Sequence, residues 1–328
     1  MDETTFDAAL RGIQKVFFVR PPQLAKPKQD MWPFLKCLQA HHIEQVVFVS
    51  LMGVEHNPIQ YLDQQVGVQV VAGAHNLHKD EQLLAAYSDV EIRRFDFLDE
   101  TTFDAALRGI QKVFFVRPPQ LAKPKQDMWP FLKCLQAHHI EQVVFVSLMG
   151  VEHNPMTPHH QIEQMIEQLQ LPYTFIRPSF FMQNLNTTHR VDIQQNHDLF
   201  IPAGRSKTSF IDTRDIGEIA GVALLDTQYL QQKLTVTGPE ALTYQQIAVL
   251  MTESFGHPVT YHRPSLWRFR RVMLKRGIKK DYVNVMVMLY LITQLGNAKR
   301  VTDTAEKVLG HAPHTMTTYL RDYADQLQ

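Results

Sequence analysis

The sequence has few of the features that would assign it to a specialised class of protein. Two cysteines in 328 residues are too few for a disulfide framework and are typical of a reducing compartment. The 33 basic and 33 acidic side chains cancel, whereas a nucleic-acid-binding protein usually carries a basic surplus. No apolar run reaches the roughly 18 residues of a membrane span, and no secretory signal opens the chain. These absences predict a globular cytoplasmic protein without a nucleic-acid partner.

The motifs of several enzyme classes are missing as well. The chain contains no H-E-x-x-H and no paired Cys-x-x-Cys, so we expect no metal site. It contains no P-loop and no G-x-S-x-G turn, which argues against a nucleoside triphosphatase and against a serine hydrolase of the common type.

One segment of the chain occurs twice. Residues 2–58 recur as residues 99–155, and the two copies agree at all 57 positions. A single exact double copy is typical of a recent tandem duplication or of an assembly error, and the sequence does not distinguish the two. The second copy continues a strand-like run that starts at Val90, whereas the first copy breaks off at Pro58. We therefore interpret the second copy as the one in its native context.

Apolar runs alternate with helical segments after residue 67. Strands are predicted at 68–72, 90–97, 113–116, 143–146 and 173–176, with helices at 81–87, 103–107, 128–135 and 160–170. This alternation predicts a parallel sheet with right-handed crossovers, and hence an α/β, doubly wound, Rossmann-like domain. Ligands of such sheets bind at the carboxyl ends of the strands. The mostly helical residues from about 244 onward predict a smaller C-terminal cap.

Several ordered stretches resemble the NmrA-like family of atypical short-chain dehydrogenases, which includes NAD(P)H-dependent quinone reductases and nucleotide-sensing regulators. They are VEIRRFDFLDETTFDAALRGIQKVFFVRPP, VVFVSLMGV, LPYTFIRPSFFMQN, SFIDTRDIGEIA and GHPVTYHRPS. The resemblance covers about residue 59 to the C-terminus. It implies a duplicated segment over 1–58 in the first-strand position, an NAD(P)-binding domain over 59–240, and a substrate-binding cap over 241–328.

The resemblance makes one absence conspicuous. Such proteins open with a strand, a glycine-rich turn and a helix, and the turn lays backbone N–H groups against the cofactor pyrophosphate. No G-x-G-x-x-G or G-x-x-G-x-x-G occurs in this chain. The copied run VVFVSLMGVEHNP stands in that place, so only Gly53 replaces the glycine cluster and Glu55 brings a negative charge toward the phosphates. We therefore expect cofactor binding to be weakened.

The resemblance and the strand ends together indicate cofactor-binding residues. His75 and Asn76 follow the second strand, and no acid precedes Asp80, which favours the 2′-phosphate of NADPH over the free ribose hydroxyl of NADH. The resemblance implies that Asp96 and Phe97 flank the adenine. The remaining candidates, at the strand ends toward the nicotinamide, are Arg117, Pro118, Ser147 and Phe180.

Catalytic residues are harder to assign. Many dehydrogenases of the superfamily use Tyr-x-x-x-Lys, in which the lysine lowers the tyrosine pKa. The spacing occurs once, from Tyr229 to Lys233, far along the chain from the expected strand loop, and we interpret it as coincidence. Ser147 and His160 are the candidate catalytic residues, because a histidine can donate a proton near neutral pH. A turn serine and a histidine at a helix N-terminus are the structural alternatives.

Three functions fit these observations. The first is an oxidoreductase that passes hydride from NADPH to a small quinone or carbonyl compound. The second is a non-catalytic sensor that binds dinucleotide and acts through a protein partner, which the missing Tyr-Lys pair favours. The third is a duplicate that has lost cofactor binding.

One segment has a strong local charge bias. Residues 263–280 contain eight basic side chains and no acid, and the apolar run 283–295 follows directly. A basic amphipathic segment can bind an acidic partner or a membrane surface. The commoner explanation of such a segment is a solvated cap helix beside a buried or dimerising helix. A homodimer or a protein partner through 263–295 is therefore a hypothesis.

Overall fold

The computed structural model describes residues 15–20, 45–50, 69–75, 90–118, 121 and 123–328. The helix predicted at 81–87 lies outside these residues. The chain divides into two compact units. Unit 1 comprises residues 1–178, 213–236 and 306–311, and unit 2 comprises residues 179–212, 237–305 and 312–328.

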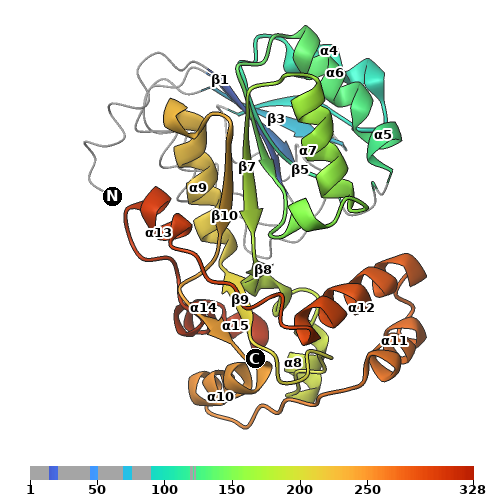
Figure 1. Ribbon diagram of the computed structural model, residues 1–328, viewed down its shortest axis with the longest axis vertical. Coiled ribbons are helices and arrows are strands. Elements are labelled where there is room, and N and C mark those ends of the chain that lie inside the picture. Colours follow the sequence, from blue (N-terminus) through green and yellow to red (C-terminus); the bar gives the residue numbers. More distant parts are fainter. Residues whose placement is uncertain (1–14, 21–44, 51–68, 76–89, 119–120, 122) are drawn as a thin grey trace. The chain divides into compact units, whose positions relative to one another are not determined.

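Unit 1 is built on a parallel sheet, which confirms the predicted α/β doubly wound fold (Figure 1). Its eight strands follow one another in space as β10 (Gln232–Val236), β7 (Tyr173–Pro178), β6 (Gln142–Val146), β5 (Lys112–Val116), β1 (Lys15–Arg20), β2 (Gln45–Ser50), β3 (Gln69–Ala74) and β4 (Val90–Arg94). Each neighbouring pair is parallel. The predicted apolar runs therefore form adjacent strands of one sheet.

Two strands of this sheet come from the first copy of the duplicated segment. They pair with each other in the register of the second copy, because Lys15 lies opposite Gln45 as Lys112 lies opposite Gln142. β2 also pairs with β3, as a first strand would, while β1 pairs with β5. The sequence predicts one strand from this segment between β3 and β5, and the sheet holds two.

The sheet is buried on both faces where helices cover it. Alternate residues of β5 and β6, among them Phe115 and Phe145, join one core with α4 (Phe103–Leu107), α6 (Trp129–Ala137) and α7 (Pro158–Gln168). α9 (Thr213–Leu225) meets the opposite face, where the ammonium of Lys112 donates to the carbonyl of Leu224 at 2.5 Å. Figure 1 shows α7 and α9 on opposite sides of β7. This two-sided cover explains why the strands read as continuous apolar runs.

Shorter elements complete unit 1. They are η2 (Glu100–Thr102), α5 (Pro124–Asp127), η3 (Val151–His153) and η5 (Thr227–Tyr229). α4 ends at Leu107, and Gly109 just beyond it adopts a positive φ of 74°, a conformation that favours glycine at a helix end. α9 begins directly after Asp212 and carries Asp215 in its first turn, where a carboxylate interacts favourably with the helix dipole.

Unit 2 is mainly helical. A three-stranded sheet of β11 (Ala241–Leu242), β9 (Thr208–Ile211) and β8 (Phe180–Phe181) packs with η4 (Met182–Asn184), α8 (Arg190–Asn196), α10 (Tyr244–Phe255), α11 (Leu266–Lys275), α12 (Lys280–Gln294), α14 (Met316–Asp322) and α15 (Ala324–Leu327). α13 (Thr304–Leu309) spans the division between the units. α10 has a capping box between Thr243 and Gln246 and ends at Gly256, whose φ is 72°. Local sequence signals thus set both ends of this helix.

The division differs from the single boundary near residue 240 that the sequence predicts. Residues 179–212 belong to unit 2 because β8 and β9 pair with each other and β9 pairs with β11. Residues 213–236 return to unit 1, where α9 covers the sheet and β10 pairs with β7. The functional assignment of the ranges 59–240 and 241–328 stays a prediction.

Candidate functional site

The carboxyl ends of the unit 1 strands lie at one edge of the sheet, because all eight strands are parallel. His75 follows β3, Asp96 and Phe97 follow β4, Arg117 and Pro118 follow β5, and Ser147 follows β6. The structure therefore brings these predicted residues to one edge. Gly53 and Asn76 lie outside the described residues. Phe180 lies in unit 2, where its ring centroid is 6.5 Å from that of Phe210.

His75 and Asp96 form a pair across β3 and β4. The Nδ1 atom of His75 lies 3.1 Å from Oδ2 of Asp96, and the His75 side chain is 46% exposed. The other carboxylate oxygen of Asp96 accepts a hydrogen bond from the Leu98 amide at 2.9 Å. The backbone N–H of Asp96 donates to the hydroxyl of Thr102 at 3.1 Å, which anchors the turn after β4. An imidazole thus stands open to a ligand, oriented by a fixed carboxylate.

Phe97 faces the core rather than the strand edge. Its ring is 3% exposed and packs edge-on against Phe95 and Phe131, with centroid distances of 4.9 and 5.1 Å. Its side chain is therefore part of the hydrophobic core, and its backbone alone is placed to contact a ligand.

Arg117 shapes the loop after β5. Its Nη1 donates to the carbonyl oxygens of Pro118 and Leu121 at 2.7 and 2.9 Å. Burial lowers the pKa of the guanidinium to about 10, against the attraction of Asp127, so the group stays protonated at neutral pH. A fixed positive charge therefore lies beneath this strand end.

Ser147 places a buried hydroxyl at this edge. It is 4% exposed, and its backbone N–H continues the sheet by donating to the carbonyl of Ile176 at 2.7 Å. Its hydroxyl oxygen is buried and has no hydrogen-bond partner among the described residues. A buried polar atom without a partner costs free energy, so this hydroxyl is suited to a ligand that supplies one.

His159 and His160 occupy the first turn of α7. Thr157 caps this helix by accepting from the His160 amide at 3.4 Å. The ring Nδ1 of His160 donates to the carbonyl of Val151 at 3.1 Å, which leaves Nε2 as the acceptor of the neutral ring. Burial and the positive charge of Arg117 lower the pKa of His159 to about 3. His159 is therefore neutral at physiological pH.

A buried ion pair near the same edge was not predicted from the sequence. Arg177, at the end of β7, donates through Nη2 and Nε to the two carboxylate oxygens of Glu163 on α7 at 2.5 and 3.0 Å. Its Nη1 reaches Glu152 at 3.1 Å. The pair joins residues fourteen positions apart, so no local sequence spacing predicts it.

Tyr229 and Lys233, the residues of the Tyr-x-x-x-Lys spacing, make structural contacts within unit 1. The Lys233 ammonium pairs with the carboxylate of Glu167 at 2.7 Å, and the backbone carbonyl of Tyr229 accepts from Thr174 at 2.8 Å. These contacts fasten β10 and η5 to β7 and α7.

The residues of the edge fit a nicotinamide dinucleotide. The His75–Asp96 pair presents an exposed imidazole after β3, and the Ser147 hydroxyl after β6 is buried without a hydrogen-bond partner among the described residues. The predicted pyrophosphate loop around Gly53 lies outside the described residues.

Comparisons with known proteins agree with this fold. The model of the NmrA-like family matches residues 59–320. The "Uncharacterized oxidoreductase YesF" of Bacillus subtilis is 31% identical over 243 residues, which cover 73% of this chain and 83% of that protein. The NAD(P)H azoreductase of Xenophilus azovorans is 29% identical over 237 residues, which cover 70% and 81%. No helix among the described residues has the length and apolar character to cross a membrane.

A solved structure gives the same result for the fold. The NADPH-dependent quinone oxidoreductase of Escherichia coli, in complex with NADPH, aligns with a TM-score of 0.70 and 19% sequence identity. The alignment covers 78% of this chain and 90% of that one.

Proposed function

Because this chain belongs to the NmrA-like family, we propose that it is an NADPH-dependent oxidoreductase that reduces a small quinone or carbonyl compound. The names of its relatives support the reaction class, since they include an azoreductase and a quinone oxidoreductase. The cofactor, when bound, supplies the hydride. The protein supplies binding, orientation and the proton.

The unsatisfied hydroxyl of Ser147 carries this proposal. It lies at the end of β6, where a parallel sheet of this type holds the nicotinamide half of a dinucleotide. We propose that Ser147 orients the carboxamide and that His160, fixed through Nδ1, exchanges a proton at Nε2. The imidazole of His75 favours the 2′-phosphate of NADPH, although Gly53 alone in place of a glycine cluster weakens the pyrophosphate site.

A titration with NADPH and with NADH tests this proposal. We expect saturable binding that favours NADPH, and reduction of a small benzoquinone by the bound cofactor. Ser147→Ala should weaken NADPH binding about 5–10-fold, because it removes one hydrogen bond in a buried site. Thr208→Val is the matched control, since the buried hydroxyl of Thr208 on β9 also has no partner in the described part of the chain and belongs to unit 2. Equal affinities for Ser147→Ala and the parent would refute the placement of Ser147.

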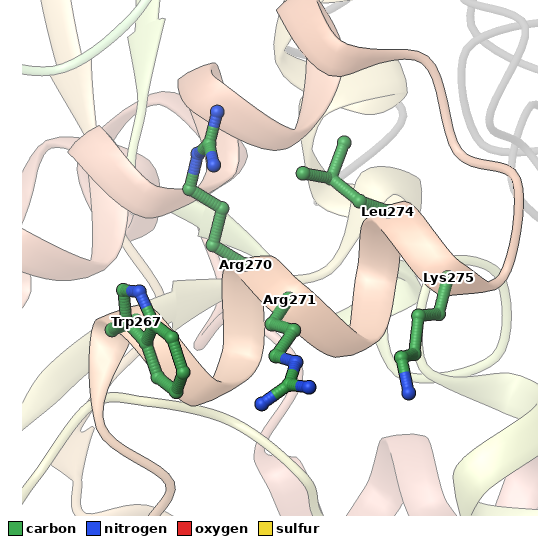
Figure 2. A pocket seen from close by; sticks show the side chains of 5 residues that line it. All are labelled: Trp267, Arg270, Arg271, Leu274 and Lys275. Carbon is green, nitrogen blue, oxygen red and sulfur yellow. The ribbon is translucent and has the colours of Figure 1, made fainter.

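A second candidate function is a dinucleotide sensor that acts through a protein partner. The observation that favours it is the basic surface of α11, with Arg271 over the ring of Trp267 at 5.4 Å. Figure 2 shows Trp267, Arg271 and Lys275 on one side of α11, with Arg270 and Leu274 directed to the other. These five residues line a shallow hollow of about 450 Å³. Apolar side chains of α12 and its end are exposed as well, namely Val285, Met288, Leu289, Leu291 and Leu295.

We propose that this surface, residues 263–295, binds an acidic segment of a cytoplasmic protein partner. Eight bases without an acid over 263–280 repel a second copy of themselves, so a homodimer through α11 is the less favoured arrangement. Trp267 is 69% exposed and can report the contact by its fluorescence.

A poly-glutamate peptide serves as the probe of this surface. We expect it to change the Trp267 fluorescence, with an affinity that falls as salt is added. Arg270→Glu/Arg271→Glu should abolish binding, whereas the control pair Lys299→Glu/Arg300→Glu, whose side chains are exposed in unit 2, should preserve it. Equal losses in both double variants would mean that net charge, and not this surface, attracts the peptide.

A further inference from the structure

Three side chains of the types that bind zinc meet between α4 and α6. Asp104 lies on α4, Cys134 lies on α6, and His138 follows the last residue of α6. Their ligand atoms all lie within 4.8 Å of one another. The four-residue step from Cys134 to His138 puts both side chains on one face of the helix. Only the packing of α4 against α6 adds the carboxylate, which lies thirty positions earlier.

The three groups converge on one point. The Cys134 thiol donates to Oδ1 of Asp104 at 3.6 Å, and Nε2 of His138 donates to the same oxygen at 2.9 Å. The sulfur and the ring nitrogen are therefore both directed at the position that Oδ1 occupies. The second carboxylate oxygen takes no part in these two bonds.

Two of the three distances between ligand atoms are close to those of a tetrahedral metal site. Bonds of 2.0–2.3 Å from zinc to nitrogen, oxygen and sulfur place neighbouring ligand atoms about 3.3–3.8 Å apart. The sulfur–oxygen distance already lies in this range, and the nitrogen–oxygen distance needs to open by only a few tenths of an ångström. The Asp104 side chain is 89% exposed, so its carboxylate can rotate without disturbing the core.

We propose that Asp104, Cys134 and His138 form a divalent-metal site with a preference for Zn²⁺. Thiolate and imidazole ligands select zinc over magnesium and calcium, and three protein ligands leave a fourth position for water. On binding, the Cys134 thiol releases its proton to solvent and the His138 ring carries its proton on Nδ1, so that sulfur and Nε2 each donate an electron pair to the metal. The ion would join α4 to α6 and is independent of the proposed reductase reaction.

The proposal departs from the absence of a metal site that the sequence predicts. That prediction rested on the missing H-E-x-x-H and Cys-x-x-Cys motifs. Ligands drawn from two segments of the chain leave no such motif, although the Cys-x-x-x-His spacing at the end of α6 is a partial signal.

The duplication decides the design of the test. The first copy carries the same residue types as Asp7, Cys37 and His41, which lie outside the described residues. Cys37 and Cys134 are the two cysteines of the chain, so Cys37→Ser leaves a single thiol. The Cys37→Ser protein is therefore the parent for all measurements.

The first measurement is Co²⁺ titration, since cobalt takes zinc sites and its bond to thiolate absorbs in the near ultraviolet. We expect the Cys37→Ser parent to bind one equivalent with a sulfur-to-cobalt band that Zn²⁺ displaces. Adding Cys134→Ser should remove the band. Adding Asp104→Asn or His138→Ala should weaken Co²⁺ binding at least about tenfold, since even outer partners of a metal site contribute that much.

His139→Asn is the matched control, because His139 is an exposed neighbour outside the three-residue cluster, and it should leave the titration unchanged. A second readout is the rate at which a thiol reagent modifies Cys134, which Zn²⁺ should slow in the parent and not in the Asp104→Asn variant. An absent cobalt–sulfur band in the parent would overturn the proposal. Equal protection by Zn²⁺ in parent and Asp104→Asn would overturn the part assigned to the carboxylate.

Discussion

Replacing Phe131 with alanine is expected to lower the free energy of unfolding by about 3–5 kcal/mol, because a fully buried ring leaves a cavity that its neighbours fill only in part. Phe131 is 0% exposed. Its ring contacts four other phenylalanines with centroid distances of 5.1–5.7 Å, and these are Phe95, Phe97, Phe103 and Phe115. Urea denaturation followed by circular dichroism measures the loss.

The duplication supplies a matched control for this substitution. Phe34 is the same residue in the same 57-residue context of the first copy. If the second copy is the native one, Phe34→Ala should cost less than about 1 kcal/mol, as substitutions away from a packed core do. Equal costs for the two variants would show that both copies bury this ring and would refute our assignment of the native copy.

Glu163→Leu is expected to lower the free energy of unfolding by a similar amount, about 3–5 kcal/mol, because it leaves the guanidinium of Arg177 buried without its main partner. Arg177 is 8% exposed and Glu163 is 3% exposed, so water cannot replace the lost carboxylate. Glu152 remains within reach of the guanidinium, at 3.1 Å. Chemical denaturation again measures the change.

Two further variants separate the buried charge from the lost packing. The double variant Arg177→Met/Glu163→Leu removes both charges and should regain most of the stability, since apolar residues often replace a buried ion pair without loss. Glu152→Gln, which changes the more exposed partner, should cost no more than about 1 kcal/mol. A double variant as unstable as Glu163→Leu would contradict the argument from an unpaired charge.

The elements of unit 1 could be predicted from the sequence because their signals are local. β5 and β6 are covered on both faces, and this burial gives the uninterrupted apolar runs VFFV and VVFV. The helix over Phe103–Leu107 was predicted to the residue, since a glycine with positive φ follows it closely. The positions of β1 and β2 in the sheet were not predictable in the same way. These strands have the same sequences as β5 and β6, so the sequence alone does not show which copy pairs with β3 and which with β5.

The place of the candidate residues at the strand ends was predictable from the sequence, and their side-chain contacts were not. Strand ends located Ser147 and Arg117, because parallel strands end at one edge of a sheet. The inward fold of Arg117 onto the carbonyl of Leu121, four residues on, depends on the path of the loop after β5. The burial of Phe97 against Phe131 depends on packing between distant segments. The same is true of the ion pair between Arg177 and Glu163, and of the meeting of Asp104 with α6.

The extra strand changes the distance between predicted site residues as well as the strand order of the sheet. In the usual doubly wound order, one strand separates the strand that carries the ribose-binding residues from the strand on the far side of the switch point. Here β2 and β1 both separate β3 from β5, so three inter-strand steps replace two. At about 4.8 Å per step, the His75 side and the Ser147 side move apart by roughly the width of a nucleobase ring. A dinucleotide has a fixed maximum length. The duplication has therefore increased the distance that a dinucleotide must span to contact both sides of this sheet edge.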